Sequence, residues 1–181
     1  MQKGTVLAEA AENLDMKAVA RVAHKATLEE IYLVDAKVER GDPLVLPSGT
    51  LSLNHKCSTK ILSFEDDKNI LPVLCNFGVA AFNKKSPDKT VMSIEASFCV
   101  SYVINPISDF DPNDIEQFSK INPVYNVWAY WREFVQSMTT RMGFSVLTIP
   151  LLKIGQKKPA KKKTKSQPVK KESTRRKKVN A

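Results

Sequence analysis

Residues 92–104 read MSIEASFCVSYVI and alternate apolar with polar side chains more regularly than any other segment of the chain. The apolar positions are Met92, Ile94, Ala96, Phe98, Val100, Tyr102 and Ile104. This alternation predicts a half-buried antiparallel strand whose apolar face is about 40 Å long. Two explanations for such a long face are open: the helical segments that follow cover it entirely, or another chain or a bound polypeptide covers part of it.

Three more extended segments precede this strand, at residues 28–40, 51–61 and 71–81, and turn residues separate them. Together the four segments predict a meander-like antiparallel sheet. In the first segment, the alternation places Tyr32, Val34, Ala36 and Val38 on one face. Upstream, residues 5–24 predict an N-terminal amphipathic helix, because apolar residues recur at spacings of four and three. These residues are Leu7, Ala11, Leu14, Ala18 and Val22.

Two helices are expected after the sheet, and each begins with a residue that caps helices followed by proline. The first begins at Asp111-Pro112, and the second begins at Asn122-Pro123 and runs to Met142, with Gly143 as its terminating residue. Tyr130 and Phe134 lie away from the main apolar stripe of the second helix, so this helix is expected to contact apolar groups on two sides, as between layers of an oligomer. The alternative is an aromatic-rich surface helix in a monomer. Residues 144–152 predict an extended segment that returns over the sheet.

The charge of the chain is divided unevenly. Residues 153–181 contain 13 basic residues and one acidic residue, a net charge of +12, whereas the other 152 residues have a net charge of −3. The segment 155–181 has no aromatic residue and predicts a disordered tail. Its basic residues, which include Lys161, Lys162, Lys163, Arg175 and Arg176, predict salt-sensitive, non-specific binding of polyanions. The expected organisation is therefore a helical segment at 1–26, one domain at 27–154 and the tail.

The motifs of common enzyme and metal sites are missing from the sequence. The six glycines form neither a dinucleotide-binding motif nor a phosphate-binding loop, and two histidines and three cysteines have no metal-ligand spacing. There is no apolar run long enough to span a membrane and no signal-peptide pattern. The sequence predicts a cytoplasmic protein that is not an enzyme, holds no metal or cofactor and does not use ATP.

Three blocks of the sequence resemble the SecB family of export chaperones. The C-terminal block contains Pro123, then Tyr130, Arg132, Glu133 and Val135 in the pattern Y-x-R-E-x-V, then Gly143-Phe144 and an L-x-I-P segment. Residues 28–35, LEEIYLVD, resemble the first strand of that family. Residues 94–96, IEA, resemble a strand whose alternate residues are tied to client binding and tetramer contacts. The resemblance covers about residues 24–154.

This resemblance implies an α+β fold, a four-stranded antiparallel sheet with helices packed on one face. It also implies a homotetramer, arranged as a dimer of dimers, and ATP-independent binding of non-native polypeptide. The residues expected to contact the client are Met92, Ile94, Ala96, Phe98, Val100 and Tyr102. Residues expected to belong to the family-motif helix are Pro123, Tyr130, Arg132, Glu133 and Gly143. The amphipathic segment at 5–24 looks more like the SecB-like chaperones of toxin-antitoxin systems, so the expected clients are preproteins or an antitoxin.

Two features depart from the SecB pattern. The C-terminal tail is basic and has no Cys/His cluster, so docking to SecA through a zinc-binding tail is not expected. The second long helix of the family is missing, because residues 150–154 lead directly into the lysine-rich tail. The alternative function is that of a nucleic-acid or ribosome-associated accessory protein acting through this tail.

Overall fold

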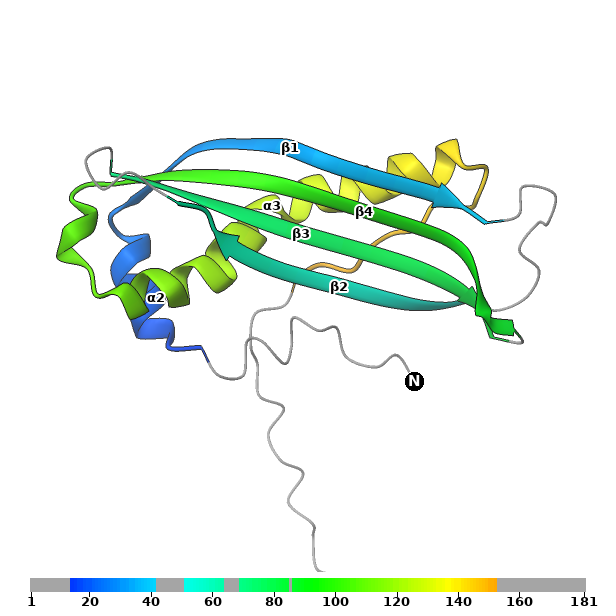
Figure 1. The fold of residues 1–181 in the computed structure, drawn as a ribbon, viewed down its shortest axis with the longest axis horizontal. Coiled ribbons are helices and arrows are strands. Elements are labelled where there is room, and N and C mark those ends of the chain that lie inside the picture. The colour runs from blue at the N-terminus through cyan, green and yellow to red at the C-terminus, as the bar shows by residue number, and fades with distance from the viewer. Residues whose placement is uncertain (1–13, 42–50, 64–68, 85, 153–181) are drawn as a thin grey trace, which may run out of the picture.

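The computed structural model describes residues 14–41, 51–63, 69–84 and 86–152. In chain order the elements are α2 (Met16–Ala23), β1 (Ala26–Arg40), β2 (Leu51–Ile61), β3 (Ile70–Asn83), β4 (Ser86–Ile104), the short 3-10 helix η2 (Ile107–Asp109) and α3 (Pro112–Arg141). One four-stranded antiparallel sheet carries α3 along one of its faces (Figure 1). The predicted α+β fold with helices on one face is therefore confirmed.

The strand order of the sheet is β1-β4-β3-β2. β2, β3 and β4 form an antiparallel meander, but β1 pairs with β4 and not with β2. The meander-like arrangement of all four strands was therefore wrong at its first connection, because the chain crosses from one edge of the sheet to the other between β1 and β2. As a result β1 and β2 are the two edge strands.

The hydrophobic core lies between the sheet and α3. The alternate residues of β4 point into it together with those of β3, which include Leu71, Val73 and Phe77. From α3, Trp131 is 1% exposed and stacks on the Phe77 ring with a centroid distance of 5.4 Å. Val127 and Val135, four residues to either side of Trp131, are fully buried. This single helical stripe supplies the second layer that the apolar face of the sheet requires.

Helix α3 is one continuous helix of 30 residues, where the sequence predicted two. Asp111 is its N-cap and accepts a hydrogen bond from the Asn113 amide at 2.7 Å, as its position before Pro112 suggested. Pro123 lies inside the helix, although it has no N–H to donate to the preceding turn. The buried stripe passes through this position without a break, from Phe118 to Val124.

The predicted end of α3 at Gly143 is confirmed. Met142 is the C-cap and Gly143 has a φ of 75°, in the left-handed region that glycine adopts readily. The Gly143 amide donates to the Thr140 carbonyl and the Phe144 amide donates to the Thr139 carbonyl, both at 3.0 Å. These two bonds form a Schellman motif, which satisfies the last carbonyl groups of the helix.

Of the predicted N-terminal helix, the structure describes α2, and residues 1–13 lie outside the described part. Asp15 caps α2 by accepting hydrogen bonds from the Lys17 and Ala18 amides. Ala18 and Val22 of the predicted stripe are fully buried, and Arg21 pairs with Asp114 in the first turn of α3. The tail residues, Lys161, Lys162, Lys163, Arg175 and Arg176 among them, also lie outside the described part, and the predicted division into 1–26, 27–154 and 155–181 stays a prediction.

Residues 144–152, called the strap below, leave α3 at Gly143 and have no regular secondary structure after residue 144. In Figure 1 the strap is the orange segment that runs back along α3 on the side of β2. Ile149 is 1% exposed, and Leu147 and Leu152 pack against the core. The predicted extended return is therefore present, and it lies along the helix. Within the described residues, no helix is long and apolar enough to cross a membrane.

Candidate functional site

The predicted client-contacting residues of β4 are all buried, and all of them except Met92 belong to the core between the sheet and α3. Exposed fractions are 5% or less for each of Met92, Ile94, Ala96, Phe98, Val100 and Tyr102. Of the two explanations left open by the sequence, coverage by the C-terminal helical region therefore describes this chain. Contact between a client and these residues would require α3 to move, and their role in client binding stays a prediction.

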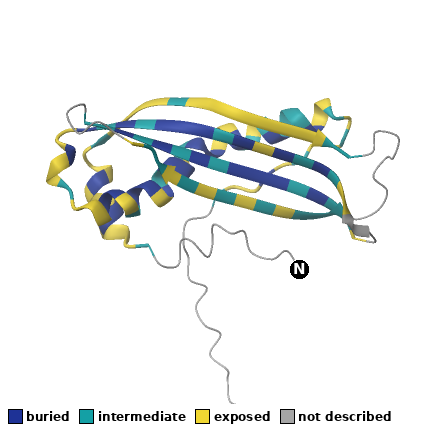
Figure 2. Ribbon diagram, viewed as in Figure 1, coloured by how far each residue is buried: buried dark blue, intermediate teal, exposed yellow. Residues whose placement is uncertain are grey.

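Among the described residues, the largest group of exposed large apolar side chains lies on the edge strand β1, which Figure 2 shows in the exposed colour along most of its length. We call this group the β1 surface. It consists of Leu28, Tyr32, Leu33, Val34 and Val38, with exposed fractions between 38% and 54%. A strand in this position also presents a row of backbone groups at the sheet edge, and no other described strand pairs with that edge.

Three residues of the β1 surface lie directly beside core residues of β4 in the sheet. Leu28 is the cross-strand partner of Tyr102, Leu33 is the partner of Phe98, and Val38 is the partner of Ile94. Cross-strand partners point to the same face of a sheet. The apolar rows of β4 therefore continue onto β1 and become accessible there, beyond the edge of α3.

Two register shifts in β1, between Leu28 and Glu30 and between Leu33 and Asp35, change which side chains share a face. Tyr32 pairs with Cys99, on the face away from α3, whereas Val38 pairs with Ile94 on the α3 face. The predicted common face for Tyr32, Val34, Ala36 and Val38 was therefore wrong. A bulge adds one residue to one strand, and each added residue reverses the alternation after it.

The flank of α3 next to the β1 surface is aromatic. The ring of Phe134 meets that of Phe98 edge to face at a centroid distance of 6.5 Å, and Phe98 is the strand partner of Leu33. Tyr130, one turn earlier on α3, is 52% exposed. The two-sided character predicted for this helix therefore corresponds to a sheet-facing stripe and an aromatic flank that remains open.

The family-motif residues of α3 occupy different environments. Pro123 is buried in the helix, Tyr130 and Glu133 are exposed, and Gly143 ends the helix. The Arg132 side chain donates a hydrogen bond from Nε to the carbonyl oxygen of Ile149 at 2.8 Å. Arg132 therefore holds the strap by a hydrogen bond, and Gly143 ends the helix where the strap begins.

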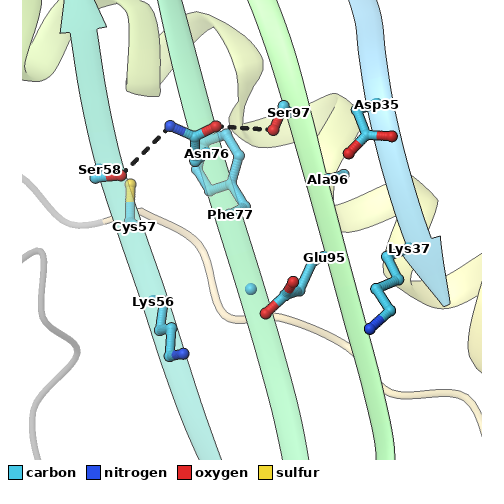
Figure 3. Close-up of a pocket in the computed structure, with 11 residues that line it drawn as sticks. Asp35, Lys37, Lys56, Cys57, Ser58, Asn76, Phe77, Glu95, Ala96 and Ser97 are labelled. Atoms are coloured by element: carbon cyan, nitrogen blue, oxygen red, sulfur yellow. Dashed lines mark hydrogen bonds between the residues drawn. The ribbon is translucent and has the colours of Figure 1, made fainter. Parts of the chain in front are cut away.

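The opposite face of the sheet has a polar hollow of about 530 Å³, shown in Figure 3. Its floor is a ladder in which Ser97 donates to Asn76 at 2.7 Å and Asn76 donates to Ser58 at 3.5 Å. The lining residues are Asp35, Lys37, Lys56, Cys57, Ser58, Asn76, Phe77, Gly78, Glu95, Ala96 and Ser97. The charged side chains come from three strands and have both signs, so the hollow has no dominant charge.

Burial shifts the pKa values of several titratable groups near these surfaces. Burial raises the pKa of the Cys57 thiol to about 12 and raises that of Cys75 further, so both are protonated at neutral pH. Burial also lowers the pKa of His55. Among the described residues, no group of three or more His, Cys, Asp or Glu side chains is close enough to hold a metal ion.

The β1 surface was not predicted from the sequence. The client contacts were predicted on β4, because β4 has the most regular alternation. The signal that was available was the LEEIYLVD segment itself, which has five apolar residues among eight and cannot bury them all on one face. What the sequence does not contain is the strand order, and this order leaves β1 at an edge.

No protein-family model matches the chain, and no curated protein matches it in sequence. Among solved structures, the chain is similar to the Mycobacterium tuberculosis Rv1957 SecB-like chaperone in complex with a ChAD peptide from the Rv1956 HigA1 antitoxin, with a TM-score of 0.66 and 16% sequence identity over 77% of this chain and 99% of that chain. A protein of unknown function from Streptococcus agalactiae has a TM-score of 0.38 and 10% identity over 70% and 97% of the two chains. The chain thus has a SecB-like fold.

Proposed function

We propose that this protein is a molecular chaperone that binds non-native polypeptides without ATP and keeps them from aggregating. The observation that carries the proposal is the β1 surface, five exposed apolar side chains on one edge strand of a SecB-like fold. Exposed apolar groups concentrated on one element mark an interaction site more often than a feature of a solitary monomer. The proposed activity is binding and not catalysis.

The chemistry of the β1 surface suits a partner without a defined sequence. Burying apolar area is worth roughly 25 cal/mol per Å², whatever side chain supplies that area. The backbone groups at the edge of β1 add hydrogen bonds that do not read side chains. The flank of α3 adds an exposed aromatic side chain at Tyr130. An unfolded segment would therefore gain binding free energy from many weak contacts. Such binding tolerates different sequences, as a chaperone for varied clients requires.

The similar structure from Mycobacterium tuberculosis is a SecB-like chaperone bound to an antitoxin peptide, and this supports polypeptide as the ligand class. We propose an antitoxin or a preprotein as the client, a cytoplasmic location and a homotetrameric assembly. In the tetramer, part of the β1 surface would contact other copies of the chain. Docking to SecA through a zinc-binding tail is not part of the proposal, because the basic tail has no cysteine or histidine.

In this proposal the predicted residues of β4 do not contact the client but pack beside the residues of the β1 surface and hold them in place. Ile94, Phe98 and Tyr102 pair with Val38, Leu33 and Leu28 and fix their orientation. Met92, Ala96 and Val100 belong to the same buried row. They would contact the client directly only in a conformation in which α3 has moved off the sheet.

The test is suppression of aggregation of a thermally unfolded client in the absence of nucleotide. Leu33→Asp should weaken client binding about tenfold, because a carboxylate in an apolar contact must stay hydrated or be neutralised. Met16→Asp is the matched control, since Met16 is also half exposed but lies on α2, away from the β1 surface. Light scattering must show the same assembly for both variants. Full activity of a folded, correctly assembled Leu33→Asp variant would refute the proposed surface.

The alternative function is a nucleic-acid or ribosome-associated role. It is suggested by the net charge of +12 in residues 153–181. A chain ending at residue 156 separates the two functions. We expect it to lose salt-sensitive binding of polyanions and to keep aggregation suppression. The opposite pattern, in which the truncation alone abolishes activity on clients, would favour the tail as the functional element.

A further inference from the structure

The strap follows one ridge of α3 and is held there by four polar contacts. Trp128 Nε1 donates to the Pro150 carbonyl at 2.9 Å, and Arg132 Nε donates to the Ile149 carbonyl at 2.8 Å. One and two turns further along, Gln136 Nε2 donates to Thr148 Oγ1 and Thr139 Oγ1 accepts from the Leu147 amide, both at 3.3 Å. The four helix residues follow each other at spacings of four, four and three, so they form a single row.

Three of these four contacts are made to the main chain of the strap and not to its side chains. Main-chain groups are the same in every polypeptide, so the row does not depend on the sequence that occupies it. The buried side chain between these contacts is Ile149, which is 1% exposed. The row therefore has the properties of a site for an extended polypeptide segment with an apolar residue near its centre.

The strap uses this site only in part. Val146 is 60% exposed and Leu151 is 68% exposed, so two of its apolar side chains gain little from the contact with α3. Arg132 and Gln136, which hold it, are themselves partly accessible to solvent. A segment with better placed apolar side chains would bury more area along the same row and would bind there more favourably.

We propose that the strap occupies a binding site for clients. An extended apolar segment of a client displaces the strap and then makes the contacts to Trp128, Arg132, Gln136 and Thr139. This inference rests on the proposed chaperone function and adds a second contact site for the client besides the β1 surface, one that is closed while the strap is in place. A tethered competitor acts at a high effective concentration. The apparent affinity for clients is then reduced by the fraction of molecules in which the site is closed.

The test is to lock the strap reversibly in the full-length assembly. Gln136→Cys with Thr148→Cys places thiols on two side chains whose native polar atoms, Nε2 of Gln136 and Oγ1 of Thr148, are 3.3 Å apart, and the shorter cysteine at 136 leaves a gap that a short linker spans. Oxidation, or a short bifunctional thiol reagent with a reducible linker, then joins them. The native thiols compete poorly, since Cys75 and Cys99 are buried and the pKa of Cys57 is about 12. Thr148→Cys alone, treated in the same way, is the matched control.

The ligand is reduced, carboxamidomethylated α-lactalbumin, which stays unfolded in water. We expect the locked form to bind it about tenfold more weakly than the control, and reduction should restore binding. Ile149→Ala, which loosens the strap, should bind it about threefold more tightly. Leu147→Ala, which removes another apolar contact of the strap with the core and leaves the row on α3 unchanged, replaces Ile149→Ala if that variant does not fold. In the unmodified protein, the Leu147 amide should exchange with solvent faster when the client is added.

Equal affinity of the locked and reduced forms, or unchanged exchange at Leu147, would overturn the inference and leave the chaperone proposal intact. If the unmodified protein and the single-cysteine control bind no client at all, the proposed function fails, and the inference fails with it. Weaker binding after locking, restored by reduction, supports both.

Discussion

Arg40, the last residue of β1, donates a hydrogen bond from Nη1 to the carbonyl oxygen of Met142 at 2.6 Å, across 102 positions of the sequence. Met142 is the C-cap of α3, where a cation is favoured by the helix dipole. The guanidinium also lies over the ring of Phe144, 5.1 Å from its centroid. One side chain thus joins the end of the edge strand to the end of the helix and to the start of the strap.

Replacing Arg40 with methionine should lower the free energy of unfolding by about 2 kcal/mol, because a hydrogen bond from a charged donor and the contact with Phe144 are both lost. Arg40→Lys should recover only part of this loss, since an ammonium group cannot reproduce the planar contact of the guanidinium. Urea denaturation measures both variants. Hydrogen exchange should locate the change at the C-terminal end of β1.

Arg141 provides the control for this prediction. It is an exposed cation in the last turn of the same helix, so Arg141→Met removes a similar charge from a similar place. We expect a change of about 0.5 kcal/mol or less, as for most exposed charges. Equal losses for Arg40→Met and Arg141→Met would mean that charge alone, and not the bridge from β1, stabilises this end of the helix.

A second bridge, between α2 and the start of α3, predicts a dependence on pH. Arg21 donates from Nε and Nη2 to the two carboxylate oxygens of Asp114, at 2.7 and 2.6 Å. These hydrogen bonds hold the pKa of Asp114 below its usual value. A carboxylate with a lower pKa in the folded state stabilises the protein above its unfolded pKa, about 3.9 for Asp, and this contribution is lost as the pH falls through the folded pKa.

The free energy of unfolding should therefore fall more steeply with acid in the unmodified protein than in Asp114→Asn, at pH values below about 4. Arg21→Gln should reduce the same slope, because the group that depresses the pKa is gone. Urea denaturation over a pH series gives the three curves. Identical acid slopes in all three proteins would mean that the pair at Asp114 contributes nothing measurable to acid stability.

The strands could be predicted from the sequence because their alternation is local information. The residues from which the strands were predicted, at 51–61, 71–81 and 92–104, lie within β2, β3 and β4. The bulges of β1 could not be predicted in the same way, since they depend on pairing with β4. A segment with apolar residues at both odd and even positions, as in Leu33-Val34, is compatible with either face until a partner strand selects one.

The location of the exposed apolar surface could not be predicted from the sequence, for a related reason. Alternation identifies the apolar face of β4, but it does not say which element covers that face. Trp128, Trp131 and Val135 of α3 cover it in the structure, and the apolar surface that stays exposed is at the edge on β1. Exposure depends on tertiary packing, and an edge strand and a central strand with the same composition are alike in sequence.

The continuity of α3 leads to a prediction about Pro123. Its ring removes the hydrogen bond to the Ser119 carbonyl that other residues would make at this position. Pro123→Ala should therefore raise the free energy of unfolding by about 1 kcal/mol. The regained hydrogen bond stabilises the folded protein by more than the greater flexibility of the unfolded chain costs. Pro112→Ala is the control at the first turn, where no bond is missing, and it should not stabilise the protein. Destabilisation by Pro123→Ala would mean that packing of the ring outweighs the missing bond.

The two glycines Gly41 and Gly78 give a matched pair for the sheet. A Cβ on Gly41 would lie 2.5 Å from the carbonyl oxygen of Thr90, a backbone atom that cannot turn away, whereas a Cβ on Gly78 would lie 3.6 Å from its nearest neighbour, on Lys56.

Gly41→Ala should destabilise the protein by about 2 kcal/mol, because the Gly41 amide must also keep its 2.8 Å bond to the Val91 carbonyl. Gly78→Ala should be neutral or stabilising by about 0.5 kcal/mol, since alanine restricts the unfolded chain. Thermal unfolding of both variants checks the order. Because Gly78 lines the polar hollow and Gly41 follows β1, the reverse order would show that the close approach at Gly41 is relieved by movement of the strand end.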